Sequence, residues 1–129
     1  MRRNHGTGRP LEAQVGFSRA VRIGNVIEVS GTAPTAPDGS TIAPGDAYAQ
    51  AKAIFAIIER ALAELGGSLS DVVRTRLFLT NAADWQAVGR AHGEAFAAVR
   101  PAATMLEIGR LLDPEWLVEI EATAVVGEA

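Results

Sequence analysis

The chain has 129 residues and a mass of 13.5 kDa, the size of one domain, and its 48% hydrophobic and 21% charged residues are typical of a globular protein. A net charge of -3 and a pI near 5.3 argue against a protein that coats nucleic acid or an anionic membrane through bulk positive charge. The lack of cysteine excludes a disulfide scaffold and a thiolate metal site, and two distant histidines, His5 and His92, are too few for a zinc site.

Residues 1–10 are polar and rich in glycine and arginine. We expect them to form a flexible N-terminal arm, which leaves residues 11–129 as a single domain. A contact of Arg2 and Arg3 with a partner molecule is the alternative interpretation of this segment.

A β pattern begins after Phe17. Ser18–Ile23 and Val26–Ser30 flank Gly24-Asn25, two residues that tolerate positive φ, and this arrangement predicts a tight hairpin. Three prolines and Asp38-Gly39 then predict that Thr32–Gly45 is a loop with at most a brief strand.

The longest helix is predicted from Asp46, which can cap its start, to about Leu65, where Gly66-Gly67 ends it. Its apolar residues recur at steps of three and four and form one stripe: Ala51, Ile54, Phe55, Ile58, Ala61, Leu62 and Leu65. A helix lying on a membrane surface would need a strongly basic polar face. Because Lys52 and Arg60 are accompanied by glutamates, the pattern predicts a core helix instead.

The second half of the chain alternates strand and helix patterns. Branched residues predict a strand at Val72–Leu79, and a second helix is predicted from Asp84 to Ala98, before Pro101. Two more strands are predicted at Ala103–Ile108 and Leu117–Val126. Two helices are too few to cover both faces of about six strands, so we predict an α+β fold: one mixed sheet with both helices packed on one face.

Alternation along the strands divides their side chains between two faces. One face is predicted to meet the helices: Val21, Ile23, Ile27, Val29, Leu77, Leu79, Leu106, Ile108, Val118, Ile120 and Ala122. The other carries charges of both signs with apolar residues among them: Arg22, Val26, Glu28, Ser30, Arg74, Arg76, Phe78, Met105, Glu107, Leu117, Glu119 and Glu121. Two interpretations remain open for this second face, a surface washed by solvent or an interface between subunits.

Catalysis without cysteine would depend on carboxylates, arginines, hydroxyls and backbone amides. Glu119 can orient a water molecule as a general base, or it can pair with a strand arginine as a structural group. Ser30-Gly31 at a strand end can hold a small polar ligand, although turns use the same dipeptide. We expect His92 to be structural.

Five segments together resemble the Rid superfamily, the YjgF-like reactive intermediate deaminases, some of which carry the label L-PSP endoribonuclease. The resemblance runs from about Pro10 to Val126 in the expected order. The segments are VGFSRAVRIGN at 15–25, VSGTAP at 29–34, DVVRTRLFL at 71–79, RPA at 100–102 and VEIEA at 118–122.

This resemblance implies a chorismate-mutase-like α+β fold that assembles as a homotrimer around a sheet-lined barrel, with small-molecule clefts between subunits. In such a trimer the charged sheet face would lie at the interface. The best-studied members hydrolyse reactive enamines or imines to a 2-oxo acid and ammonia, and they need neither a metal nor a cofactor. For this chain the resemblance therefore implies that no cofactor is needed. The acidic pI, the short apolar runs and the lack of a secretory signal lead us to expect a cytoplasmic protein without a nucleic-acid or membrane partner.

The resemblance also identifies candidate site residues. The arginine that holds the substrate carboxylate in the deaminases would stand at Ala103, and a common cleft tyrosine is Phe17 here. Ser30 matches a cleft serine, and Glu119 matches the glutamate that steers the attacking water. Thr104 and Met105 would line the same cleft, where Arg76, or else Arg90, would be the replacement cation.

Three functions follow as hypotheses. The first is hydrolysis of an imine or enamine, which loss of a two-pronged carboxylate contact would weaken roughly tenfold to a hundredfold in binding. The second is binding of, or action on, a more apolar metabolite. The third, ribonuclease activity or translation inhibition, is disfavoured by the acidic pI and the single lysine, Lys52.

Overall fold

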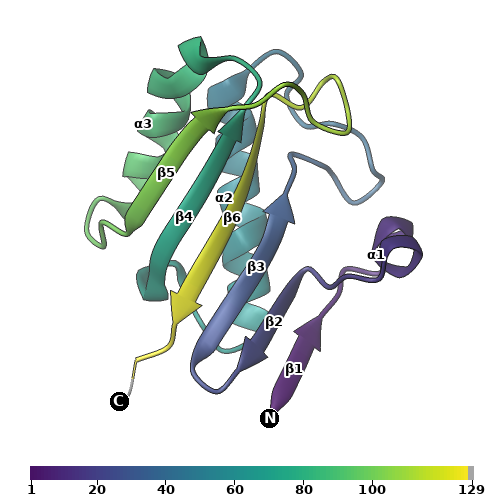
Figure 1. The fold of residues 1–129 in the computed structure, drawn as a ribbon, viewed down its shortest axis with the longest axis vertical. Coiled ribbons are helices and arrows are strands. Elements are labelled where there is room, and N and C mark those ends of the chain that lie inside the picture. Colours follow the sequence, from purple (N-terminus) through teal and green to yellow (C-terminus); the bar gives the residue numbers. More distant parts are fainter. Residues whose placement is uncertain (128–129) are drawn as a thin grey trace.

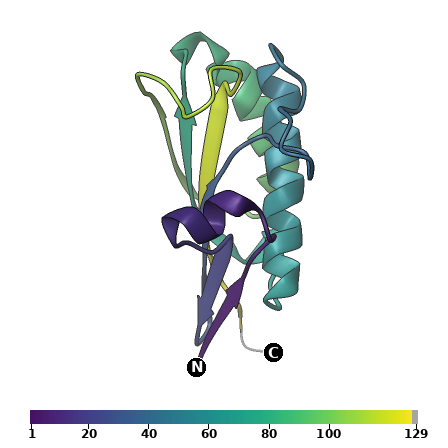
Figure 2. The ribbon, with the colours of Figure 1, turned by 90° about the vertical axis from the view of Figure 1, so that its right-hand side faces the viewer.

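The computed structural model describes residues 1–127, in which six strands form one sheet and the two long helices pack on one of its faces (Figures 1 and 2). The strands are β1 (Arg2–His5), β2 (Ala20–Ile23), β3 (Val26–Thr32), β4 (Val72–Leu79), β5 (Ala102–Glu107) and β6 (Val118–Val125). The helices are α1 (Pro10–Val15), α2 (Ala47–Glu64) and α3 (Trp85–Phe96), with short 3-10 turns η1 (Leu69–Asp71) and η2 (Ala82–Asp84).

The sheet has the order β1-β2-β3-β6-β4-β5, in which β4 and β5 are parallel and all other neighbours are antiparallel. The parallel pair needs a crossover, which α3 supplies. In the view of Figure 2, α2 lies along one side of the sheet. The predicted α+β fold with one mixed sheet and helices on one face is therefore confirmed.

Helix α2 forms where its pattern predicts. The Asp46 carboxylate accepts a hydrogen bond from the Ala49 N–H at 3.0 Å, and Gly66, at φ 83°, lets the chain turn after the helix. Ile54, Ile58 and Leu62 are fully buried on the stripe that faces the sheet. Each such side chain contributes about 1.5–3 kcal/mol through burial.

The first ten residues differ from the expected flexible arm, because they contain β1, which pairs with β2. Arg3 donates a hydrogen bond to the Leu65 carbonyl at 3.0 Å, and Arg22 of β2 donates to the same oxygen at 2.8 Å. Helix α2 has no basic residue in its last turn, so these two guanidinium groups supply the positive charge that stabilises its C-terminal end. The sequence pattern does not reveal this partner because it lies 62 residues away from Arg3.

Strand β2 is also turned by one residue from the predicted orientation. Arg22 is paired with Ile27 and therefore faces the helices, whereas Val21 and Ile23 lie on the open face of the sheet. Ile23 is accordingly 54% exposed. The prediction of this strand was wrong because it placed Arg22 on the charged face of the sheet. Arg22 lies on the helix face instead, because the Leu65 carbonyl at the end of α2 accepts its hydrogen bond there.

The prediction for edge strand β5 was also wrong by one residue, so its side chains were assigned to the wrong faces. Met105 is paired with Leu77 and packs against the core, and Glu107 lies beside Leu79 on that side. Leu106 is instead beside Phe78 on the open face and is 40% exposed. An edge strand buries little of either face, so hydrophobic alternation specifies its orientation weakly. Leu117 and Ile108 lie just outside the strands, and Leu117 also packs against the core.

Two buried polar side chains hold loops and helices to the sheet. Gln50 in α2 is fully buried, donates to the carbonyls of Ala43 and Glu115, and accepts from the Leu117 N–H. The Thr75 hydroxyl lies 2.9 Å from His92 Nε2, so His92 is a structural residue between α3 and the sheet. None of the helices within residues 1–127 is long and apolar enough to cross a membrane.

Candidate functional site

Three of the predicted site residues come together at one end of β3. The Ser30 hydroxyl donates to the Ser18 carbonyl at 2.7 Å, and its N–H donates to the Arg19 carbonyl at 3.0 Å. These bonds fix Ser30 against the segment that carries Phe17. Glu119 reaches the same place from β6, the neighbour of β3.

The carboxylate of Glu119 rests on the backbone of Gly31. Between Val29 and Thr32 the register of β3 against β6 shifts, which forms a bulge. A Cβ built on Gly31 would lie 2.6 Å from Glu119 Oε2, too close for a side chain to share the space. Glycine at position 31 therefore allows the carboxylate to lie directly over the bulge.

Arg19 connects these groups and was not among the residues identified from the sequence. Its Nη2 donates to the Gly31 carbonyl at 2.6 Å, and its guanidinium carbon lies 5.6 Å from the centre of the Phe17 ring. Its Nε atom is buried and has no hydrogen-bond partner among the described residues. The available signal was an arginine beside the predicted Phe17 and opposite Ser30 in the hairpin.

Burial raises the pKa of the Glu119 carboxyl above the usual range of glutamate. The positive charge of Arg19 opposes this shift, and the negative charge of Glu121 adds to it. A carboxyl group with a raised pKa exchanges a proton with water near neutral pH more readily than an ordinary glutamate does. The site can therefore supply proton transfer beside a hydroxyl and an aromatic ring.

The remaining predicted site residues lie elsewhere in the chain. Ala103, Thr104 and Met105 are on edge strand β5, which β4 and β6 separate from β3. Three strand spacings amount to roughly 14 Å. Within one chain, the β5 residues and Ser30 therefore form two separate groups.

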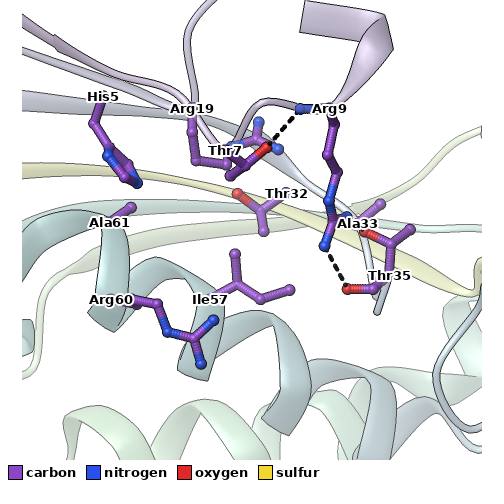
Figure 3. A pocket seen from close by; sticks show the side chains of 10 residues that line it. All are labelled: His5, Thr7, Arg9, Arg19, Thr32, Ala33, Thr35, Ile57, Arg60 and Ala61. Carbon is purple, nitrogen blue, oxygen red and sulfur yellow. Dashed lines mark hydrogen bonds between the residues drawn. The ribbon is translucent and has the colours of Figure 1, made fainter. Parts of the chain in front are cut away.

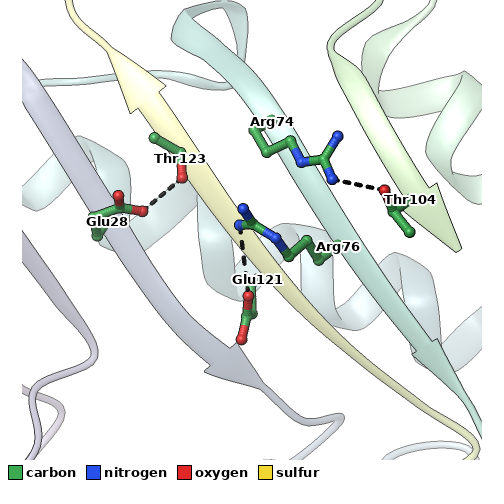
Figure 4. A network of polar contacts seen from close by, with 6 residues as sticks. All are labelled: Glu28, Arg74, Arg76, Thr104, Glu121 and Thr123. Atoms are coloured by element: carbon green, nitrogen blue, oxygen red, sulfur yellow. Dashed lines mark hydrogen bonds and ion pairs between the residues drawn. The ribbon is translucent and has the colours of Figure 1, made fainter. Parts of the chain in front are cut away.

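The arginines considered as a replacement cation are engaged in other contacts. Arg76 lies 3.8 Å from a Glu121 oxygen, in the exposed polar cluster drawn in Figure 4. Arg90 in α3 stacks on Tyr48, with its guanidinium carbon 3.9 Å from the ring centre. Within a single chain, the cation beside Glu119 and Phe17 is Arg19.

The open face of the sheet combines this polar cluster with apolar side chains. In Figure 4, Arg74 donates to the Thr104 hydroxyl at 2.6 Å, and Thr123 donates to Glu28 at 2.6 Å. Ile23, Val26 and Val125, on neighbouring strands of the same face, are 41–54% exposed. Exposed apolar side chains around partly paired charges are typical of a surface that contacts another protein.

No group of three or more His, Cys, Asp or Glu side chains that could hold a metal ion occurs in the part of the chain that the structure describes. The Glu119 group brings together a carboxyl, a guanidinium, a hydroxyl and backbone groups.

Comparison with known proteins places the chain among relatives over nearly its whole length. A family model described as endoribonuclease L-PSP matches residues 7–126. The uncharacterised protein SCO2049 of Streptomyces coelicolor is 41% identical, over 94% of this chain and 90% of that protein. The 3-aminoacrylate deaminase RutC of Acinetobacter baylyi is 35% identical, over 94% of this chain and 93% of that protein.

The fold agrees with these matches. The crystal structure of Rv2704 from Mycobacterium tuberculosis, described as a member of the YjgF/YER057c/UK114 family, is 40% identical with a TM-score of 0.89. The alignment covers 98% of this chain and 100% of that one. The YjgF-family protein NMB1025 from Neisseria meningitidis has a TM-score of 0.81 at 30% identity, over 100% and 98% of the two chains.

Proposed function

The chain belongs to the Rid, or YjgF-like, superfamily, and from this premise we propose that it hydrolyses a small imine or enamine in a cleft between subunits. The observation that carries the proposal is the half-buried Glu119 carboxyl, packed on Gly31 beside Ser30 and Phe17. Its raised pKa suits a group that both accepts and returns a proton. The name of the relative RutC, a 3-aminoacrylate deaminase, supports the same class of reaction.

In the proposed reaction Glu119 accepts a proton from water as the water oxygen bonds to the imine carbon. The electron pair of the C=N bond moves to nitrogen, which takes up a proton from solvent, and a carbinolamine forms. Glu119 then returns its proton to nitrogen, the C–N bond breaks while the hydroxyl proton passes to solvent, and ammonia and a carbonyl compound are released. An enamine enters the same sequence after it is protonated on carbon. The reaction consumes one water and needs no oxidant.

The proposed cleft requires a second subunit, because Ala103 lies on edge strand β5, which β4 and β6 separate from Ser30 on β3. A homotrimer whose open sheet faces meet would bring β5 of one copy to the Glu119 group of the next. The mixed apolar and charged composition of that face supports this arrangement. We propose that Thr104 contributes from the β5 side.

The substrate we propose lacks the carboxylate that the deaminases bind, because position 103 is alanine. An exposed methyl group cannot form the two-pronged, charge-assisted hydrogen bonds of a guanidinium. The aromatic ring of Phe17, without a hydroxyl, also makes the site more apolar. Uncharged imines derived from amines fit this chemistry better than imino acids.

The test compares two freshly generated substrates, 2-aminoacrylate and the imine of an uncharged ketone, by following ammonia release against a buffer blank. We expect acceleration of the uncharged imine and little acceleration of 2-aminoacrylate. Glu119→Gln should abolish the acceleration, and the matched variant Glu121→Gln should retain it. Rates equal to the blank for both substrates would contradict the proposal.

A second candidate function is binding of an apolar metabolite without hydrolysis, which the Ala103 methyl and the Phe17 ring favour. It predicts a ligand that raises the melting temperature but gives rates equal to the blank, and that binds Glu119→Gln as well as the unaltered chain. Ribonuclease activity has weaker support, because the chain is acidic and has a single lysine.

The assembly is tested separately by light scattering on the unaltered chain, with the expectation of three copies per particle. Arg76→Glu places a second acidic side chain beside Glu121 in the centre of the open face and should dissociate the particle. Arg110→Glu, an exposed change in the loop after β5, is the control that should leave the mass unchanged. A particle of one chain would overturn the intersubunit cleft.

A further inference from the structure

A cavity of about 60 Å³ lies between helix α2 and the N-terminal segment, on the helix side of the sheet (Figure 3). We propose that it binds a small oxyanion, a phosphate or a carboxylate, through guanidinium groups from three separate parts of the chain. The basic residues that line it are His5, Arg9, Arg19 and Arg60. The inference does not depend on the function proposed above.

The cations reach the cavity from different elements. Arg9 precedes α1, Arg19 precedes β2, and Arg60 belongs to α2. Both Arg9 and Arg60 line the cavity, and Figure 3 shows them on opposite sides of the group of lining side chains. A net charge of -3 for the whole chain makes this local concentration of positive charge unusual in the molecule.

Arg9 is held in place before any ligand arrives. Its Nη1 donates to the Thr35 hydroxyl, and its Nη2 lies 3.4 Å from the Thr35 carbonyl. A side chain already fixed by the protein loses little rotational freedom when it binds an anion. Two contacts to Thr35 leave further N–H groups of this guanidinium available.

Three other side chains that line the cavity retain unused donors. Within residues 1–127, the Arg60 guanidinium and the His5 ring have no side-chain hydrogen bond or ion pair, and buried Arg19 Nε has no acceptor. A buried donor without an acceptor destabilises a protein. An oxyanion in the cavity would provide acceptors for these groups.

The carboxylates near Arg19 do not occupy this position. Glu12 accepts from the Thr7 N–H at 3.0 Å and from its hydroxyl at 2.5 Å, which holds its carboxylate at the rim. Glu119 rests on Gly31. No aspartate or glutamate of the described chain lines the cavity itself, although the charges of Glu12 and Glu119 act on Arg19 from outside it.

The volume limits the ligand to a few heavy atoms. A cavity of about 60 Å³ has space for several water molecules, since one water needs roughly 10–15 Å³ by the same measure. A phosphate or a short carboxylate fits this space. A nucleotide does not, although its terminal phosphate could enter from the open side.

The test is calorimetric titration of the full chain with inorganic phosphate and, in a second arm, with acetate, at constant ionic strength. We expect saturable phosphate binding. Arg60→Gln should weaken it about tenfold, the effect of losing one charge-assisted hydrogen bond. Arg60 is exposed and supports no other contact, so this variant should fold normally. Arg110→Gln removes the same charge from an exposed loop and is the matched control.

The two arms also identify the kind of anion, because the ligand that binds more tightly and depends on Arg60 is the preferred one. A nitrogen-proton NMR spectrum of the Arg19 Nε–H gives an independent signal, which should shift with the preferred ligand. The proposal is overturned if neither anion saturates the protein. It is equally overturned if Arg60→Gln binds as the unaltered chain does, or if Arg110→Gln weakens binding to the same extent.

Discussion

The two faces of the sheet satisfy their polar groups in different ways. On the helix face Gln50 and Thr75 are fully buried, and their polar atoms are paired within the chain. On the open face the Arg76–Glu121 pair is 3.8 Å long and exposed, with apolar residues such as Ile23 and Val26 uncovered nearby. The polar groups buried at the centre of the helix face are paired within one chain, whereas the open face leaves apolar side chains exposed among its charges.

The largest effect should come from Gln50→Leu on the helix face. This change leaves the Leu117 N–H and the carbonyls of Ala43 and Glu115 without their buried partner. We expect a loss of roughly 3 kcal/mol or more in the free energy of unfolding, measured by denaturant titration. Gln86→Leu on exposed α3 surface should change it by less than about 0.5 kcal/mol. Equal losses of unfolding free energy in the two variants would contradict the importance of the buried Gln50 hydrogen bonds.

His92→Leu should cost less, and its effect should depend on pH. Near pH 7 the variant leaves the buried Thr75 hydroxyl unpaired, which costs about 1–2 kcal/mol. Burial lowers the pKa of His92, so the unfolded chain binds the proton first as the pH falls. The unaltered chain therefore loses stability between the unfolded and the folded pKa of this histidine, and the variant does not.

Thermal unfolding of both proteins from about pH 7 to pH 4.5 checks this expectation, because that window begins above the ordinary histidine pKa. The difference in stability should narrow toward the acidic end. A constant difference would show that His92 titrates alike in the folded and unfolded chains.

Glu119→Gln on the open side should have a smaller effect of opposite sign. Burial raises the folded pKa of Glu119, so protonation favours the folded chain. That contribution is complete below the unfolded pKa and is lost as the pH rises through the folded value. The variant should thus be more stable than the unaltered chain near pH 7 and similar near pH 4.

Melting temperatures across this range measure the effect, with Glu121→Gln as the control that lacks the contact with Gly31. A variant less stable than the unaltered chain at pH 7 would show that attraction to Arg19 outweighs the cost of burial. The attraction between Glu119 and Arg19 would then be the main contact that holds the site together.

The smallest effect concerns the Arg76–Glu121 pair. A double-mutant cycle with Arg76→Met and Glu121→Gln should give a coupling energy below about 1 kcal/mol, as for other solvent-exposed ion pairs. The cycle is measured at a protein concentration low enough to dissociate any assembly. A coupling above about 2 kcal/mol that appears at higher concentration would sharpen the comparison, because it would mean that a second copy covers this face.

Hydrophobic periodicity predicted the interior well. The stripe of α2 and the alternation of Val72–Leu79 and of β6 each face a continuous apolar layer, and that layer fixes their orientation. β2 and β5 lie nearer the edges of the sheet, where burial is one-sided, and both were predicted one residue out of phase.

The candidate site was predictable only in part. Glu119, Ser30 and Phe17 were identified through a resemblance, and the structure brings them together. Arg19 was missed although its position opposite Ser30 in the hairpin was a signal, because its role depends on side-chain contacts with Gly31 and Phe17. A cavity formed by residues from distant elements, such as Arg9 and Arg60, has no pattern in the linear sequence.

The hydrogen bonds from Arg3 and Arg22 to the last carbonyl beyond α2 tie the beginning of the chain to the middle. Fusion of an affinity tag at Met1, or removal of the first few residues, would consequently destabilise more of the protein than strand β1 alone. Fraying would spread to the last turn of α2, the helix end beside Gly66. The beginning of this small protein is thus a poor point of attachment for engineering, because both an edge strand and the end of a helix depend on it.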